Sequence, residues 1–193
     1  NMQKQISRVA RRGDVAERQT SLLSSSFACG LLSGVLDDEP NIVSAELLLR
    51  ERGIELIEDK RPGRGAFASS IRAHLTTRDG DRIVAGTLFG ENMPRLVQLG
   101  AHQLEAFLDG HLLIFQHSDV PGIIGAVGTI CGRHDVNIAQ MAVGRASPGG
   151  EAIGILNLDT AASANLIAEI GRHEAISRVR CIELPPAGAL PLW

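Results

Sequence analysis

Between residues 110 and 184 the spacing of apolar residues alternates between the period of a strand and the period of a helix. In chain order the segments are a strand at 111–117, a helix at 122–134, strands at 136–145 and 151–159, a helix around 166–170 and a strand at 176–184. A β-α-β-β-α-β order within about 75 residues is the ferredoxin-like plan, so this half of the chain predicts one compact domain.

The pattern in the preceding residues is different and predicts two helices followed by strands. Residues 21–36 are apolar enough for a buried helix, and 37–53 form a better one, with Asp37 or Asp38 as its cap and Gly53 at its end. Strand-like alternation follows at 71–77 and 83–89, then in RLVQL (95–99) and around 104–106. This order predicts helices packed on an antiparallel sheet.

These patterns divide the chain into four parts. We expect a linker or frayed segment at 1–20, a first domain at 21–109, the ferredoxin-like domain at 110–184 and a tail at 185–193. The predicted fold class is α+β, and the 44% of hydrophobic residues is sufficient for buried cores.

Composition excludes several functions. Aromatic residues make up 3% and the net charge is −3, which disfavours nucleic-acid binding. No stretch approaches the roughly 20 apolar residues of a membrane span. The six histidines are scattered, so no metal site is expected. Cys29, Cys131 and Cys181 are widely spaced, which favours a reducing, cytoplasmic location. Cys131 lies on the apolar face of its helix and is expected in the core.

The segment HSDVPG (117–122) places polar residues directly before a helix that Pro121 and Gly122 open. Free N–H groups and the positive dipole end of such a helix can hold a carboxylate. The glycines that follow do not fit GxGxxG, so we predict no dinucleotide site. Their simpler interpretation is that small residues let the helix approach the sheet or a neighbouring subunit closely.

The stretch HSDVPGIIGAVGTICGRHDVNIAQMAVGR resembles the core motif of an ACT domain, a ferredoxin-like module that binds amino acids at subunit interfaces. More narrowly, it resembles the ACT domain of long-form D-3-phosphoglycerate dehydrogenase. EPNIVSAELLLRERGIEL and RIVAGTLFGENMPRLVQLGAHQLEAFLDGHLL resemble the intervening, or allosteric-substrate-binding, domain of that family. The catalytic domains of the family, with their NAD site, have no counterpart in this sequence.

The resemblance implies an effector site for L-serine. His117 and Asp119 match the polar pair before the Pro-Gly, and Asn137 matches an asparagine that reaches the ligand from the adjacent subunit. Asp119 would pair with the ammonium of the effector. The alternatives remain open: Asp119 as a helix N-cap, His117 as a surface residue at a strand end, and Asn137 as a turn residue.

The resemblance also implies a weaker, anion-binding site in the intervening domain. Arg95 and His102 match its basic positions, while a third basic position is Phe107 here. A hairpin between Arg95 and His102 would bring both near one pocket. The alternative is that Arg95 is a solvated charge on an edge strand. Arg133 and Arg145 are expected as interface charges.

The sequence therefore predicts the regulatory portion of a D-3-phosphoglycerate dehydrogenase of L-serine biosynthesis, assembled as a homodimer or tetramer. We expect no catalytic residues and no cofactor in this chain, with NAD serving upstream catalytic domains. Two other functions remain open: a stand-alone amino-acid-sensing ACT protein, and a beta-subunit-like part of an iron–sulfur L-serine dehydratase.

Overall fold

The structure, a computed structural model, describes residues 5–17, 21–33, 40–61, 63, 65–77, 80–90 and 93–185. The chain forms two compact units, and the boundary between them falls after Thr87. No helix in the described ranges is long and apolar enough to cross a membrane. The predicted α+β class is confirmed.

The first unit contains a sheet in the order β2-β1-β3-β4. Its elements are β1 (Gln5–Gly13), η1 (Asp14–Glu17), α1 (Ser21–Leu32), α2 (Ala45–Glu51), β2 (Ile54–Arg61), β3 (Ser69–Thr77) and β4 (Gly80–Phe89). Strands β1 and β2 are parallel, and β3 runs antiparallel to β1 and to β4. Parallel neighbours need a long crossover connection, and α1 and α2 lie within it.

Strand β1 corrects the prediction that residues 1–20 are a linker. It lies between β2 and β3, with Ser7, Val9 and Arg11 buried. Two of these three inward residues are polar, so the apolar alternation that marks a half-buried strand is missing. The sequence does not indicate β2 for the same reason, because the strand carries Glu55, Glu58 and neighbouring charges.

The two predicted helices of this unit are present with altered ends. Helix α2 begins at Ala45 with Ser44 as N-cap, and the turn before it is held by the Asn41 side chain, which accepts from the N–H groups of Val43 and Ser44. The proposed caps Asp37 and Asp38 lie outside the described residues. The helices pack together through small and apolar residues, among them Ala28, Cys29, Leu32, Ala45 and Leu49.

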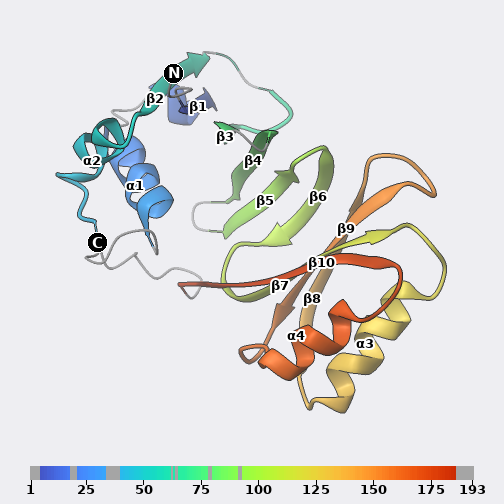
Figure 1. The fold of residues 1–193 in the computed structure, drawn as a ribbon. Coiled ribbons are helices and arrows are strands. Elements are labelled where there is room, and N and C mark those ends of the chain that lie inside the picture. Colours follow the sequence, from blue (N-terminus) through green and yellow to red (C-terminus); the bar gives the residue numbers. More distant parts are fainter. Residues whose placement is uncertain are drawn as a thin grey trace. The chain divides into compact units, whose positions relative to one another are not determined.

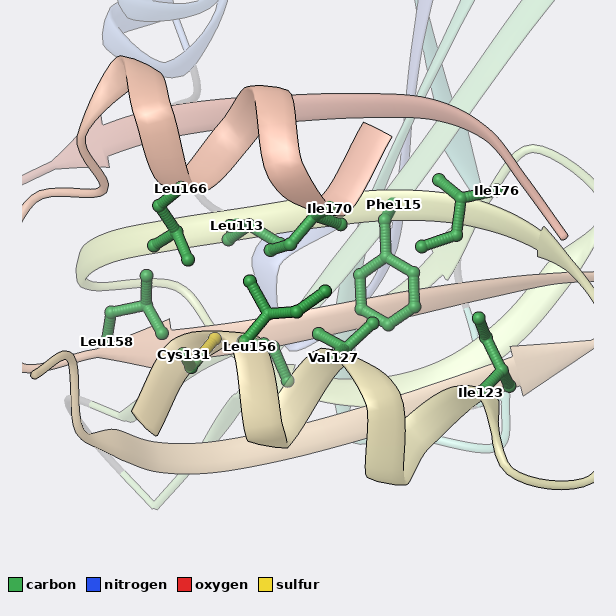
Figure 2. Packing of buried hydrophobic residues seen from close by; sticks show 11 residues of the cluster. Leu113, Phe115, Ile123, Val127, Cys131, Leu156, Leu158, Leu166, Ile170 and Ile176 are labelled. Atoms are coloured by element: carbon green, nitrogen blue, oxygen red, sulfur yellow. The ribbon is translucent and has the colours of Figure 1, made fainter. Parts of the chain in front are cut away.

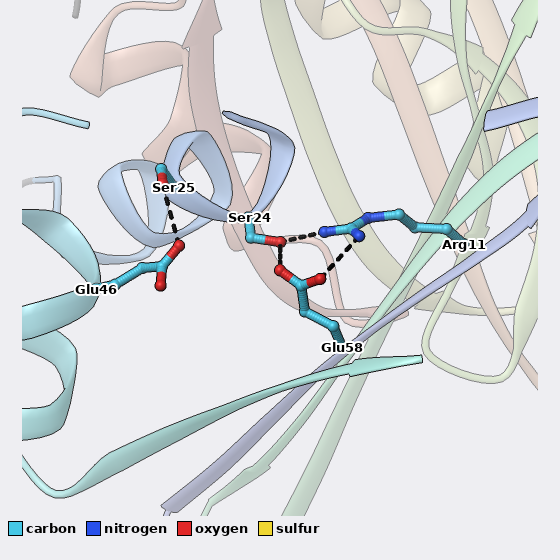
Figure 3. A network of polar contacts seen from close by, with 5 residues as sticks. All are labelled: Arg11, Ser24, Ser25, Glu46 and Glu58. Atoms are coloured by element: carbon cyan, nitrogen blue, oxygen red, sulfur yellow. Dashed lines mark hydrogen bonds and ion pairs between the residues drawn. The ribbon is translucent and has the colours of Figure 1, made fainter. Parts of the chain in front are cut away.

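A polar network, in which Arg11 and Ser24 are buried and Glu58 is 38% exposed, joins the helices to the sheet in this unit (Figure 3). The Arg11 guanidinium, fully buried, donates to the Glu58 carboxylate at 3.0 Å and to the Ser24 hydroxyl, which in turn donates to Glu58. Ser25 donates to Glu46 at 3.0 Å, linking α1 to α2. Hydrogen bonding by Arg11 lowers the pKa of Glu58, so this carboxylate is ionised at neutral pH.

The second unit contains the predicted ferredoxin-like domain (Figure 1). Its elements are β7 (Gly110–Ser118), α3 (Ile123–Arg133), β8 (Ile138–Arg145), β9 (Glu151–Leu158), α4 (Ala164–Gly171) and β10 (Ile176–Leu184). The sheet order is β10-β7-β9-β8, and every pair in it is antiparallel. The predicted order of elements is confirmed. Ser163 caps α4, and its hydroxyl accepts from the Leu166 N–H at 3.2 Å.

Helices α3 and α4 cover one face of this sheet and enclose an apolar core (Figure 2). Phe115 of β7 is fully buried there, and Gly154 of β9 leaves the space that its ring occupies, because a Cβ on Gly154 would overlap the ring. Cys131 also belongs to this core, as predicted. Burial raises the pKa of its thiol, so Cys131 is an apolar packing group here.

The opposite face of the sheet is covered by a hairpin of β5 (Met93–Leu99) and β6 (His102–Phe107). Leu96 and Ala106 of the hairpin pack with Leu112, Ala142 and Ile155 of the sheet. Residues 88–109 therefore pack with the ferredoxin-like domain, whereas the sequence placed them in the first domain. The physical reason is that β7 and β9 are apolar on both faces, so both faces need covering.

Candidate functional site

The first candidate residue, His117, lies near the end of strand β7. Its side chain is 2% exposed and stacks on Phe115 with ring centroids 5.3 Å apart, so it is not a surface residue at a strand end. Its Nδ1 lies 2.8 Å from the Ser118 carbonyl oxygen, which only accepts, so Nδ1 carries the proton. In the neutral ring Nε2 is then an acceptor, and this buried atom has no partner among the described residues.

Asp119, two residues later, is fastened to the turn between β8 and β9. Its Oδ2 accepts from the Gly149 N–H at 3.0 Å and from Arg145 Nη1 at 3.3 Å, and its own N–H donates to the Gly150 carbonyl at 2.8 Å. The hydrogen bond from Gly149, supported by Arg145, lowers the pKa of Asp119. The junction therefore presents an ionised carboxylate in a fixed position.

Helix α3 begins beside this carboxylate. Its N-cap is Gly122, in the left-handed region at φ 90°, and none of the side chains that the structure describes caps the helix. Asp119 is therefore not the N-cap, and Gly122 suits the position because a side chain at this φ is strained. The glycines of α3 do not serve close packing against the described residues, since a Cβ at Gly125, Gly128 or Gly132 would meet none of their atoms within 4 Å.

Asn137 lies at the other end of α3, directly before β8. Its Nδ2 donates to Asp159 Oδ2 at 2.8 Å, and its carbonyl accepts from the Asp159 N–H at 3.2 Å. These bonds hold the loop before β8 against the end of β9. Between Asn137 and Asp119 lies α3, whose eleven residues span about 16 Å at 1.5 Å rise per residue. One copy of the chain therefore does not bring the two together.

Strand β8 connects the two ends of this arrangement. It starts next to Asn137 and ends at Arg145, which bonds Asp119, and it forms an edge of the four-stranded sheet. Met141 and Val143 are exposed along it by 44% and 41%, and Val120 in the loop before α3 by 43%. An edge strand with exposed apolar residues is a surface on which another strand can pair.

The basic residues proposed for an anion are not brought together. In the β5–β6 register Arg95 faces Phe107 while His102 faces Leu99, so the two lie about 13 Å apart along the hairpin. The Arg95 guanidinium lies over the Phe107 ring at 3.9 Å and the Phe89 ring at 5.6 Å, so it is not a solvated edge charge. His102 is buried, with Nε2 at 3.3 Å from the Glu151 carbonyl.

Arg145, predicted as an interface charge, forms an ion pair with Asp119. The sequence does not indicate this pair, because 26 residues separate the two in the chain. The sequence does place Arg145 at the end of a strand, directly before the turn SPGG that leads back to β9. Within the described ranges no group of three or more histidine, cysteine or acidic residues has the arrangement of a metal site.

The order βαββαβ, with both helices on one face, defines this part of the chain as a ferredoxin-like domain. Residues 111–175 match the ACT domain, and residues 2–100 match the D-3-phosphoglycerate dehydrogenase intervening domain. The chain therefore belongs to the D-3-phosphoglycerate dehydrogenase family, and it carries the regulatory intervening and ACT domains of that family.

Curated relatives agree with this assignment. The D-3-phosphoglycerate dehydrogenase of Bacillus subtilis is 32% identical over 173 residues, which cover 90% of this chain and 33% of that protein. The enzyme of Archaeoglobus fulgidus is 32% identical, covering 89% of this chain and 33% of its own length. That of Methanocaldococcus jannaschii is 30% identical, with 89% and 32% covered. The chain thus spans about a third of these relatives.

Proposed function

We propose that this chain is the regulatory portion of a D-3-phosphoglycerate dehydrogenase and that it binds L-serine where two ACT domains pair. The observation that supports this most directly is the separation of Asp119 and Asn137 at opposite ends of α3. A site that uses both residues needs a second copy of the chain. NAD and the oxidation of 3-phosphoglycerate then belong to other domains of the full enzyme.

Pairing through β8 would assemble such a site. If two β8 strands pair antiparallel about a two-fold axis near Met141, the start of one strand lies beside the end of the other. Asn137 of a second copy then lies near Arg145 and Asp119 of the first. The pairing would also cover the backbone edge of β8 and the exposed side chains of Met141 and Val143.

The polar groups suit a small amino acid with a hydroxyl group. The ionised Asp119 can accept from the ammonium, and the free N–H groups at the start of α3 can donate to the carboxylate. His117 Nε2, an acceptor without a partner in the described chain, can accept from the hydroxyl. Such a bond would satisfy a buried acceptor whose isolation costs about 1–3 kcal/mol.

Calorimetry with L-serine tests the site. Asp119→Ala removes the partner of the ammonium, and we expect binding to weaken by about 2–4 kcal/mol, or roughly a hundredfold. Asn137→Ala should cost about 1 kcal/mol. Asn165→Ala, an exposed asparagine on α4, is the matched control and should bind as the parent chain does. A chain that light scattering shows to be monomeric, or an Asp119→Ala variant with unchanged affinity, contradicts the proposal.

Mixed assemblies test whether the site is shared. When Asp119→Ala and Asn137→Ala chains form a mixed dimer, a shared site puts both substitutions in one pocket and leaves the other pocket intact. Mixing the two variants should therefore restore sites of parental affinity. If each site lay within one copy, every pocket would carry one substitution and mixing would restore nothing.

A further inference from the structure

The ion pair between Asp119 and Arg145 has the polarity of an amino-acid zwitterion. Asp119 lies in the loop between β7 and α3, and Arg145 lies at the end of β8. Arg145 Nη1 and Asp119 Oδ2 are 3.3 Å apart, and the two side chains are 58% and 24% exposed. The carboxylate does not depend on Arg145 for its position, because the Gly149 N–H also holds Oδ2. Arg145 can therefore move away while Asp119 remains in place.

The energetics favour such an exchange. An ion pair with this exposure contributes little, because water solvates both charges when they separate. The guanidinium group, by contrast, offers two parallel N–H donors that match a carboxylate, a geometry that the single contact with Asp119 does not use. An amino-acid zwitterion placed between the two side chains would pair its ammonium with Asp119 and its carboxylate with Arg145. The carboxylate would accept two parallel hydrogen bonds from the guanidinium.

We infer that Arg145 binds the α-carboxylate of the effector amino acid, and that the ligand replaces the Arg145–Asp119 ion pair. The ammonium of the ligand then pairs with Asp119 and its carboxylate with Arg145. This inference rests on the proposed serine site and assigns it a further residue. The site should therefore prefer ligands with a carboxylate, because a ligand without one gives Arg145 no new partner.

Two ligands and two substitutions test the assignment. L-Serinamide keeps the ammonium and the hydroxyl of L-serine but replaces the carboxylate with a neutral amide. For the parent chain we expect L-serine to bind roughly ten- to a hundredfold more tightly than L-serinamide in calorimetry. Arg145→Gln should weaken L-serine binding more than L-serinamide binding, and should therefore lower the ratio of the two affinities.

Arg61→Gln is the matched control. Arg61 is 64% exposed, lies in β2 of the first unit and pairs with Asp59, so the same substitution removes a comparable surface ion pair outside the ferredoxin-like domain. It should leave both affinities and their ratio unchanged. Arg145→Lys keeps the charge but loses the bidentate geometry, and it should fall between the parent chain and Arg145→Gln.

The outcomes separate this inference from the function on which it rests. If the parent chain and Arg145→Gln bind L-serine equally, with the same preference over L-serinamide, Arg145 does not bind the carboxylate and the serine site still stands. If the parent chain does not bind L-serine at all, both the site and this assignment are wrong. If Arg145→Gln fails to fold, the Arg145→Lys ratio decides: an unchanged ratio rejects the assignment.

Discussion

The two units of this chain hold their layers together in different ways. In the ferredoxin-like domain, helices and sheet meet through apolar side chains, with Phe115 and Leu156 fully buried between them. In the first unit, the fully buried Arg11 is bonded to Ser24 and Glu58 where helix and sheet meet. Apolar packing responds to changes of side-chain volume but not to pH, whereas an ion pair to a buried arginine depends on its partner and on protonation.

The largest effect is expected in the apolar core. Phe115→Ala should lower the free energy of unfolding of the second unit by about 3–5 kcal/mol, because Gly154 opposite the ring has no side chain to fill the cavity. Urea unfolding followed by circular dichroism measures it. Val120→Ala, at an exposed position, should change stability by less than about 0.5 kcal/mol. Equal effects of the two substitutions would show that this core is loosely packed.

A smaller, pH-dependent effect is expected in the first unit. Glu58→Gln should lower the free energy of unfolding at neutral pH by about 1–2 kcal/mol, because the buried Arg11 loses a charged partner while water screens the partly exposed Glu58. The pKa of Glu58 is lowered by folding, so its contribution is fully present above the unfolded pKa of a glutamate and is lost as pH falls through the folded pKa.

Unfolding measured between about pH 3 and pH 7 tests this sign. The parent chain and the Glu58→Gln variant should differ at neutral pH and converge in acid. Glu51→Gln, at the exposed end of α2, is the control and should change stability little at any pH. A constant gap between the parent chain and Glu58→Gln across the range would mean that the network acts through hydrogen bonds alone.

The smallest effect compares one helix from each unit. Gly30 in α1 and Gly125 in α3 are both exposed, and an added Cβ would meet nothing within 4 Å at either position. Alanine should therefore stabilise either helix by up to about 1 kcal/mol. If α3 meets a second copy, Gly125→Ala should also weaken self-association in light scattering, and Gly30→Ala should not. Identical self-association of the two variants would show that the glycines of α3 are not part of the interface.

The sequence predicted the ferredoxin-like domain better than the first unit because apolar residues mark its elements more clearly. Its strands and helices carry apolar residues at regular spacing, so their order followed from the pattern, as did the burial of Cys131. In β1 the inward positions are Ser7, Val9 and Arg11, and no apolar alternation marks the strand. Its place beside β2 depends on partners almost 50 residues away in the chain, as in the pairing of Gln5 with Ile54.

For the site, local sequence identified the polar residues and the helix that separates them. His117, Asp119 and Asn137 flank an amphipathic segment whose helical period is strong enough to be read without a structure. The length of that helix also follows from the sequence, and with it the distance that keeps Asn137 from reaching Asp119 in one copy.

Only the tertiary structure decided the environment of each group. Burial of His117 with an unpartnered nitrogen, the ion pair of Asp119 with Arg145, and the separation of Arg95 from His102 all depend on strand register and on the turn between β8 and β9. Period-two and period-3.6 patterns follow from the local geometry of strands and helices, so they can be recognised in the sequence. Register and side-chain pairing arise from contacts between distant segments, and these exist only once the sheet has formed.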